Sequence, residues 1–302
     1  MSEAPDFILF AQHGWADTHK EIATMAKILA TPQTLIIAPN LGWFRTWLRI
    51  EPLIDRVEEI ASQILATYPD TPIRIMGHSM GGLIWLEVLS RHPEWWPQVE
   101  SFVLIASPVG GADLARFFDP FGMGIGIAGA LGVNRRKMAK LIAKTIPTLV
   151  IAGDIDGGSD GTITVETTKF GEAKFVSLLN LHHAKLKNHP AVVDIIREFW
   201  ANPVITECPP PDFVSILIER LQSIPGIMDA HRRDFRRAKT CITFPNGLTI
   251  RTWRNPLGVD HVFIADCDGQ CLYSGFVGLI HVAALRKVLK EIQEEFQNRD
   301  EG

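Results

Sequence analysis

The sequence predicts an α/β fold: a mostly parallel sheet with helices on both of its faces, joined to a small C-terminal α+β appendage. Over the first two hundred residues, short apolar runs alternate with amphipathic, helix-like runs, which is typical of a parallel sheet covered on both faces. At 202–212 the composition changes, and three consecutive prolines from Pro209 indicate a stiff boundary segment. Beyond it, two hairpin signals lie between two helix-like runs.

The first part is expected to contain six strands that alternate with helices. The strands are predicted at Phe7–Ala11, Thr34–Ala38, Ile73–Met76, Val99–Ala106, Thr148–Ala152 and Phe175–Leu179. The helices are predicted at His19–Leu29, Ile54–Tyr68, Leu83–Leu89 and Ala191–Trp200. In sheets of this kind the functional residues gather at the carboxyl ends of the strands.

The last third of the chain is expected to form a separate unit. We predict helices at Phe213–Leu221 and Ile280–Phe296, and hairpins formed by Lys239–Phe244 with Leu248–Trp253 and by Val262–Asp266 with Gln270–Tyr273. Asn246-Gly247 between two alternating runs is a strong hairpin signal. The expected domains are therefore 1–202 and 203–302, and the second contains no motif that points to a reaction.

An insertion at 109–146 interrupts the alternation of strands and helices. It has a glycine-rich apolar piece that ends at Gly132 and a basic amphipathic run, Arg135–Lys144. Two interpretations stay open: a lid that moves over the site and lines an apolar pocket, or a packed connecting helix. Gly124-x-Gly126-x-x-Gly129 matches a dinucleotide fingerprint, but it follows no strand and lacks the acidic partner, so we reject a nucleotide site.

Composition and charge exclude several classes of protein. Apolar residues make up 46% of the 302 residues, charged residues make up 21%, and the net charge of −4 gives no reason to expect a nucleic-acid partner. The four cysteines do not resemble a secreted disulfide framework, and no histidines at ligand spacing suggest a metal site. Without a signal-like N-terminus or an apolar run of ~18 residues, we expect a cytoplasmic protein that does not span a membrane. Transient contact with a membrane is compatible with this expectation, and the oligomeric state is left open.

The segment Gly77-His78-Ser79-Met80-Gly81 is the strongest functional signal. Gly-x-Ser-x-Gly between a strand and a helix is the nucleophile elbow, a turn so tight that the serine is strained and its hydroxyl is exposed above the sheet. Small residues are needed two places before and after the serine, because side chains there would collide with the neighbouring strand and helix. Ser79 is therefore the candidate nucleophile.

A serine hydroxyl needs a base, and the base needs an acid that orients it. In proteins with this elbow the three follow one another in the order Ser, Asp or Glu, His. Two loops that follow predicted strands supply such residues in this order: 153–163 contains Asp156 and Asp160, and 180–183 contains His182 and His183.

These motifs resemble those of the α/β-hydrolases, nearest to the lipase and esterase branch, over about residues 7–200. The resemblance rests on His13-Gly14, the elbow, Ser107-Pro108-x-Gly110-Gly111, Ser159-Asp160-Gly161-x-Ile163 and the late histidine. It implies that Asp160 is the acid and His183 the base. Asp156 and His182 remain alternatives, because Asp156 fits the pattern of other branches and adjacent histidines cannot both point at Ser79.

The resemblance also implies an oxyanion hole made by two backbone N–H groups. One belongs to Met80, directly after the nucleophile, and the other to Trp15, directly after His13-Gly14. The loop Trp15–His19 is shorter than in many relatives of this branch, so the acyl side of the pocket is expected to have a different shape.

The leading hypothesis is a serine hydrolase that cleaves a carboxylic ester, of a small molecule or a lipid, through an acyl-enzyme on Ser79 and without a cofactor or metal. An acyltransferase or thioesterase with the same triad is the second hypothesis. The third is a binding protein that keeps the fold without catalysis and uses the appendage for interaction.

Overall fold

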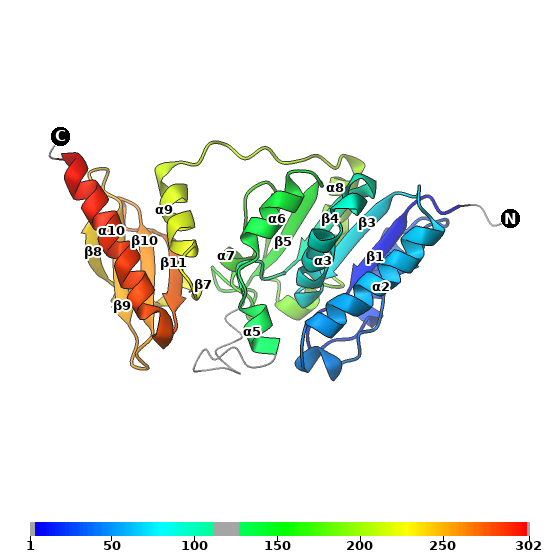
Figure 1. The fold of residues 1–302 in the computed structure, drawn as a ribbon, viewed down its shortest axis with the longest axis horizontal. Coiled ribbons are helices and arrows are strands. Elements are labelled where there is room, and N and C mark those ends of the chain that lie inside the picture. The colour runs from blue at the N-terminus through cyan, green and yellow to red at the C-terminus, as the bar shows by residue number, and fades with distance from the viewer. Residues whose placement is uncertain (1–3, 112–126, 301–302) are drawn as a thin grey trace.

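The computed structural model describes residues 4–111 and 127–300, which form two sheets with their own helices (Figure 1). The first sheet is parallel throughout and has the strand order β2-β1-β3-β4-β5-β6. Its strands are β1 (Ile8–Gln12), β2 (Leu35–Ile37), β3 (Ile73–His78), β4 (Val99–Ile105), β5 (Thr148–Asp154) and β6 (Lys174–Leu179). The predicted α/β class and its parallel sheet are confirmed.

Helices cover both faces of this sheet. On one face lie α1 (Lys20–Leu29) and α8 (Pro190–Ala201), and on the other lie α2 (Glu51–Thr67), α3 (Met80–Arg91) and α6 (Arg136–Ala143). Alternate residues of β1 belong to the two cores: Phe10 packs with α2 and α3, and Leu9 with α1 and α8. Because every residue of β1 is buried, the strand reads in the sequence as a nearly continuous apolar run.

The second sheet is antiparallel, with the order β7-β11-β10-β9-β8. Its elements are α9 (Phe213–Gln222), β7 (Ile227–Asp229), β8 (Lys239–Thr243), β9 (Thr249–Arg254), β10 (Asp260–Ala265), β11 (Cys271–Val277) and α10 (Val282–Asp300). The two helices pack on one face of the sheet, where residues such as Leu221, Ile250 and Val277 form a separate core. The predicted α+β appendage is therefore present, and Gly247 in its first hairpin turn has a φ of 82°.

Several short elements are absent from the sequence prediction. They are α5 (Ile127–Leu131), α7 (Val165–Thr168), β7 and the 3-10 helices Arg45–Trp47, Pro93–Gln98, His183–Lys185, Arg232–Arg237 and Leu279–His281. The predicted lid and the rejected nucleotide motif lie partly at 112–126, outside the described residues. In the described part of the insertion, α6 packs on α3, and Arg135 forms an ion pair with Glu87 of α3 at 2.7 Å. The lid stays a prediction.

The two units are joined by an exposed linker, 203–212, and contact each other directly. Figure 1 shows the linker passing along one edge of the molecule from α8 to α9, while β7 lies beside α7. Arg136 of α6 forms a buried ion pair with Asp229 of β7, and Lys140 of α6 pairs with Glu219 of α9. Among the helices that the structure describes, none combines the length and apolar character needed to cross a membrane.

Candidate active site

Ser79 lies at the turn between β3 and α3, in a backbone conformation that an L-residue adopts only under strain. Its φ is 55° and its ψ is −126°. The turn is held to the neighbouring strand because the Ser79 N–H donates to the Ile105 carbonyl at 2.8 Å. Such strain is retained only where the surrounding structure fixes it, and it is common at functional sites.

The glycines of the elbow make the turn sterically feasible. A Cβ on Gly77 would lie 2.4 Å from the backbone nitrogen of Gly82, and one on Gly81 would lie 2.3 Å from the Gln12 carbonyl oxygen. A Cβ on Gly82 would lie 2.1 Å from the Ser107 Oγ. The pattern Gly-x-Ser-x-Gly-Gly therefore follows from the close approach of α3 to the ends of β1 and β4.

Asp160 and His183 form a pair on the two loops that follow β5 and β6. The Asp160 Oδ2 lies 2.7 Å from the His183 Nδ1. The other carboxylate oxygen accepts the N–H groups of Thr162 and Ile163 at 2.9 and 2.7 Å, and the His183 N–H donates to the Asp160 carbonyl at 3.0 Å. Because Asp160 is only 2% exposed and its oxygens are occupied in this way, the carboxylate is fixed against the imidazole.

The His183 loop is also tied to the elbow. The His78 Nε2 donates to the His183 carbonyl at 3.1 Å, and the two imidazole rings are 4.7 Å apart. Since the His183 Nδ1 faces Asp160, its Nε2 is the ring nitrogen left for proton transfer. Within the described ranges the Ser79 hydroxyl forms no hydrogen bond to this ring, and catalytic hydrogen bonds of this kind often shorten only in the complex with substrate.

Two buried histidines beside the site are held in the neutral form. Burial, and to a smaller extent the nearby His183, lowers the pKa of His78 well below its ordinary value. Burial likewise lowers the pKa of His13. A neutral His78 places no positive charge beside the neighbouring His183 ring.

The loop after β1 carries the predicted oxyanion donor Trp15 and is fixed from both sides. The His13 ring donates through Nδ1 to the Gly14 carbonyl and accepts the Leu41 N–H through Nε2, each at 3.0 Å. The fully buried Thr46 accepts the Ala16 N–H at 3.0 Å. The loop therefore keeps its position beside the elbow.

Gly14 brings this loop against the nucleophile. A Cβ on Gly14 would lie 2.9 Å from the Ser79 Cβ and 3.3 Å from the Met80 nitrogen. Met80 is the first residue of α3, so its N–H has no partner within the helix and the positive end of the helix dipole lies at this point. Two backbone segments thus meet beside Ser79.

An ion pair joins the loop that carries His183 to the loop after β1. The Lys187 ammonium lies 2.8 Å from Asp17 and 2.6 Å from Glu21. Although burial lowers the pKa of Lys187, the hydrogen bonds that its ammonium donates to the two carboxylates outweigh this effect and raise the pKa above the ordinary value. Lys187 therefore remains charged at neutral pH.

The alternative acid and base lie apart from the pair. Asp156 accepts the Ser159 N–H at 2.8 Å and lies 3.2 Å from the His231 Nε2, so it faces the appendage. His182 is exposed, whereas His183 is half-buried against Asp160. The structure brings His183 and Asp160 together and does not place His182 or Asp156 in that contact.

Sequence reasoning missed the residues that support the site. Thr46, Lys187 and His231 belong to no motif, and each contacts a residue at least thirty positions away in the chain. For Thr46 and Lys187 we find no local signal in the sequence. His231 precedes the basic run of Arg232–Arg237, but only the fold brings it to Asp156.

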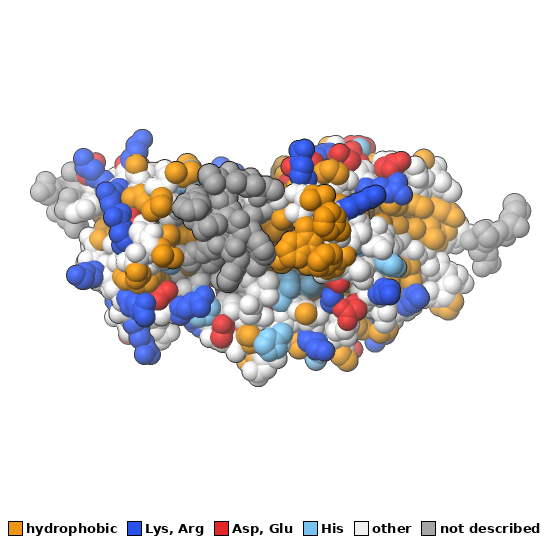
Figure 2. Space-filling view, turned by 90° about the horizontal axis from the view of Figure 1, so that it is seen from below, with side chains coloured by type: hydrophobic (Ala, Val, Ile, Leu, Met, Phe, Trp, Pro, Cys, Tyr) orange, Lys and Arg blue, Asp and Glu red, His pale blue; other side chains and the backbone are white. Residues whose placement is uncertain are grey.

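Aromatic side chains border the oxyanion side of the site. The ring centroids of Trp15 and Trp47 are 4.4 Å apart, and those of Trp43 and Trp47 are 5.4 Å apart. Trp43, Phe44 and Leu48 are 50%, 69% and 54% exposed. Figure 2 shows hydrophobic side chains gathered on this part of the surface, with histidines beside them. Across the described residues, no group of three or more His, Cys, Asp or Glu side chains could hold a metal ion.

Comparison with known proteins gives the same fold. No curated protein matches the chain. Est1E from Butyrivibrio proteoclasticus, solved with ferulic acid bound, is 14% identical with a TM-score of 0.50 and covers 66% of this chain and 90% of its own. Lipase BlEst2 from Bacillus licheniformis is 15% identical with a TM-score of 0.47 and covers 68% of this chain and 94% of its own. At 14% identity the likeness to Est1E shows the fold alone.

A family model matches most of the chain. The match extends over residues 3–205, which is more than half of the sequence and ends before α9. The resemblance to the α/β-hydrolases that the motifs indicate is therefore confirmed. The chain belongs to the family described as serine aminopeptidase, S33 (Hydrolase_4), within the α/β-hydrolase superfamily.

Proposed function

We propose that this hydrolase cleaves carboxylic esters of small molecules or lipids through an acyl-enzyme on Ser79. His183 is the general base and acid, Asp160 orients its ring, and the N–H groups of Met80 and Trp15 hold the oxyanion. The observation that carries the proposal is the 2.7 Å contact between Asp160 and His183, on loops beside a strained serine at the end of β3.

In the first half of the reaction, the Ser79 Oγ attacks the ester carbonyl carbon while the His183 Nε2 takes the hydroxyl proton. The carbonyl electron pair moves to oxygen, and the two N–H groups stabilise the resulting negative charge. When the tetrahedral intermediate collapses, the bond to the alcohol oxygen breaks and His183 returns the proton to the leaving alcohol. Water repeats these steps on the acyl-enzyme and releases the acid.

The test compares two serines of the same helix region. We expect Ser79→Ala to reduce p-nitrophenyl ester turnover to the ~10³–10⁴-fold over water that an oxyanion hole and binding alone provide. Labelling by a fluorophosphonate probe should disappear as well. Ser90→Ala, on the exposed side of α3, should keep both activities. Full turnover by the Ser79→Ala variant would rule out the proposed nucleophile.

The family description makes peptide hydrolysis the second candidate function. An aminopeptidase substrate carries an ammonium group that needs a carboxylate partner, but Asp17 and Glu21 beside the site already form ion pairs with Lys187. The aromatic border at Trp43 and Trp47 favours an apolar acyl group instead. Faster turnover of amino-acid p-nitroanilides than of p-nitrophenyl esters would reverse this preference.

Two further hypotheses from the sequence are decided by the same assays. Transfer of the acyl group to an added alcohol or thiol in preference to water would identify an acyltransferase, and faster cleavage of thioesters would identify a thioesterase. Absence of probe labelling in folded protein would favour a binding protein without catalysis. A cytoplasmic location stays a prediction of the sequence.

A further inference from the structure

The segment 154–169, here called the acid segment, carries Asp160 but contains little regular structure of its own. It leaves β5 at Asp154, whose Oδ1 accepts the N–H groups of Gly157 and Gly158 at 2.7 and 2.8 Å. One turn of helix, α7 (Val165–Thr168), is its only helix. A loop of this kind holds a catalytic group in place only if neighbouring elements fix it.

The appendage contacts the beginning of the acid segment through His231. The His231 Nδ1 accepts the Arg233 N–H at 2.9 Å, so in the neutral ring the hydrogen is on Nε2. This nitrogen lies 3.2 Å from the Asp156 Oδ1 and donates to it. The side chain of His231 is only 12% exposed, and a Cβ on Gly158 would lie 3.1 Å from its Nε2.

Asp156 transmits this contact to the residue next to Asp160. Its carboxylate accepts the N–H and the hydroxyl of Ser159 at 2.8 and 2.9 Å, and the Ser159 hydroxyl in turn accepts the Gly161 N–H at 3.2 Å. Burial alone would raise the pKa of Asp156, but the hydrogen bonds from Ser159 and the nearby His231 keep it below the ordinary value. The backbone on both sides of Asp160 is therefore linked to His231.

The appendage is linked to the end of the acid segment indirectly, through Asp229, two residues before His231, and Arg136 of α6. Asp229 pairs with Arg136, and the two side chains are 1% and 8% exposed. The same guanidinium donates to the Glu166 and Lys169 carbonyls at 3.0 Å each. Asp229 and His231 therefore act on opposite ends of the acid segment, with Asp160 between them.

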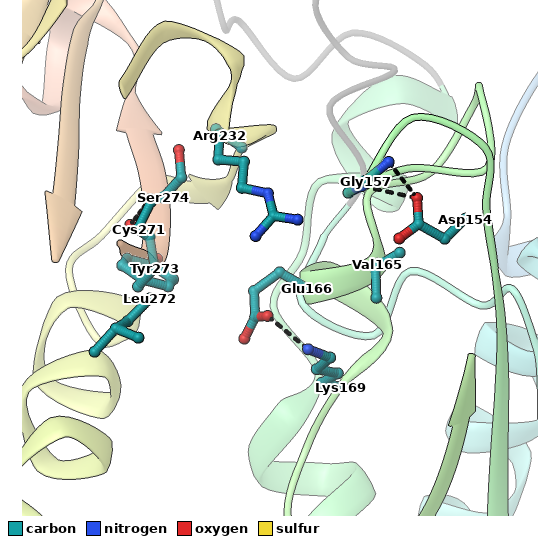
Figure 3. Close-up of a pocket in the computed structure, with 12 residues that line it drawn as sticks. Asp154, Gly157, Val165, Glu166, Lys169, Arg232, Cys271, Leu272, Tyr273 and Ser274 are labelled. Atoms are coloured by element: carbon teal, nitrogen blue, oxygen red, sulfur yellow. Dashed lines mark hydrogen bonds and ion pairs between the residues drawn. The ribbon is translucent and has the colours of Figure 1, made fainter. Parts of the chain in front are cut away.

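A small polar pocket of about 190 Å³ lies between the units and is lined by residues of both the acid segment and the appendage. Figure 3 shows Asp154, Gly157, Val165 and Glu166 of the acid segment on one side and Cys271, Tyr273 and Ser274 of β11 on the other, with Arg232 reaching between them. The acid segment is therefore supported at its two ends and is not packed against the appendage along its whole length.

We propose that the appendage positions the catalytic acid, with His231 as the main positioning residue and Asp229 as the second. This inference rests on the proposed function, because it assigns to Asp160 the role of orienting His183. The appendage thereby becomes part of the catalytic unit, although it contributes no atom that touches the substrate.

The test uses full-length variants of His231. We expect His231→Ala to lower kcat about ten-fold with KM nearly unchanged, because small displacements of a catalytic group reduce the rate without changing substrate binding. His231→Gln should recover most of kcat, since the Gln Nε2 can donate to Asp156. His92→Gln is the matched control: it alters a histidine that contacts Glu58 and Glu94 away from the site, and it should leave kcat unchanged.

A spectroscopic measurement separates positioning from general stability and does not depend on turnover. The proton on the His183 Nδ1, in its hydrogen bond to Asp160, should give a low-field NMR resonance in the wild-type protein. We expect this resonance to shift or broaden in the His231→Ala variant at a temperature where the protein is folded, and to return in the His231→Gln variant. An unchanged resonance and kcat in His231→Ala, or a Gln variant as impaired as the Ala variant, would overturn the proposal.

Failure of the proposed function gives a different result. If the wild-type protein neither reacts with the fluorophosphonate probe nor turns over esters, Ser79 is not an ester nucleophile. The NMR comparison of wild-type, Ala and Gln variants still decides whether His231 positions Asp160 and His183.

Discussion

At the scale of single residues, the candidate site depends on imidazoles with different roles. In the proposed mechanism His183 gains and loses a proton, whereas His78, only 4% exposed, is kept neutral by burial and donates to the His183 carbonyl. A histidine with a lowered pKa in the folded state binds fewer protons than in the unfolded state once the pH falls below its ordinary value. Its contribution to stability is therefore complete above about pH 6.5 and is lost at lower pH.

The substitution His78→Gln keeps a donor to the His183 carbonyl but does not titrate, so its effect on stability should depend on pH. We expect the loss of unfolding free energy caused by the substitution to be smaller at pH 5.5 than at pH 7.5, by about 1.4 kcal/mol. Urea unfolding of the wild-type and His78→Gln proteins at the two pH values measures this difference. An equal cost at both values would show that His78 titrates normally in the folded protein.

The residues of the site differ in how well the sequence predicts them. Ser79 could be predicted because the elbow requires glycines at fixed spacing, and that requirement is local. The order of residues narrows the acid to Asp156 or Asp160 and the base to His182 or His183, but which pair meets depends on the loop conformation. Thr46 and His231 could not be predicted, because their contacts to Ala16 and Asp156 exist only in the fold.

At the scale of elements, α3 shows how a tertiary contact reverses a local preference. Glycine normally destabilises a helix relative to alanine by about 1 kcal/mol. At Gly81, however, a Cβ would lie 2.3 Å from the Gln12 carbonyl oxygen, which is backbone and cannot rotate away. The close packing of α3 on the end of β1 therefore requires glycine.

We expect Gly81→Ala to destabilise the protein by about 1–3 kcal/mol, as overpacking does in other cores, in place of the small gain expected from helix propensity. Ser90→Ala, at an exposed position of the same helix, should change stability by less than about 0.5 kcal/mol. The midpoints of thermal unfolding of the Gly81→Ala and Ser90→Ala variants, each compared with the parent, test this expectation. A Gly81→Ala variant as stable as the parent would mean that α3 shifts freely on the sheet.

The long strands and helices were predicted to within a few residues, whereas several short elements were missed. The strand predicted at Val99–Ala106 is Val99–Ile105, because it is buried on both faces and its apolar run is unbroken. In contrast, β7 has only three residues and α7 only four, too few for any periodicity to show. Their conformations are set by their neighbours β11 and β5.

At the scale of the whole molecule, the two units could be predicted but not their contacts. The prolines before α9 indicate a boundary, whereas the Arg136–Asp229 pair joins residues ninety-three positions apart in the chain. A single buried ion pair leaves no pattern in the sequence. Such a pair is costly to break, because the remaining charge stays buried without a partner.

We expect Asp229→Leu to destabilise the protein by about 3–5 kcal/mol, since it leaves the Arg136 guanidinium unpaired. The double variant Arg136→Met, Asp229→Leu should be more stable than Asp229→Leu alone. A double-mutant cycle of unfolding free energies measures the coupling. Strictly additive effects would show that the two side chains do not interact across the units.

The linker 203–212 gives the contacts between the units a property that two separate chains would lack. Ten residues reach at most about 35 Å, so an appendage that leaves the acid segment stays within a small volume around it. Binding of the appendage to the acid segment and its release are then first-order events. The fraction of molecules in which the two are in contact is therefore the same at any protein concentration. The specific activity should accordingly survive extreme dilution, whereas a chain cut within the linker would lose activity as the two fragments separate.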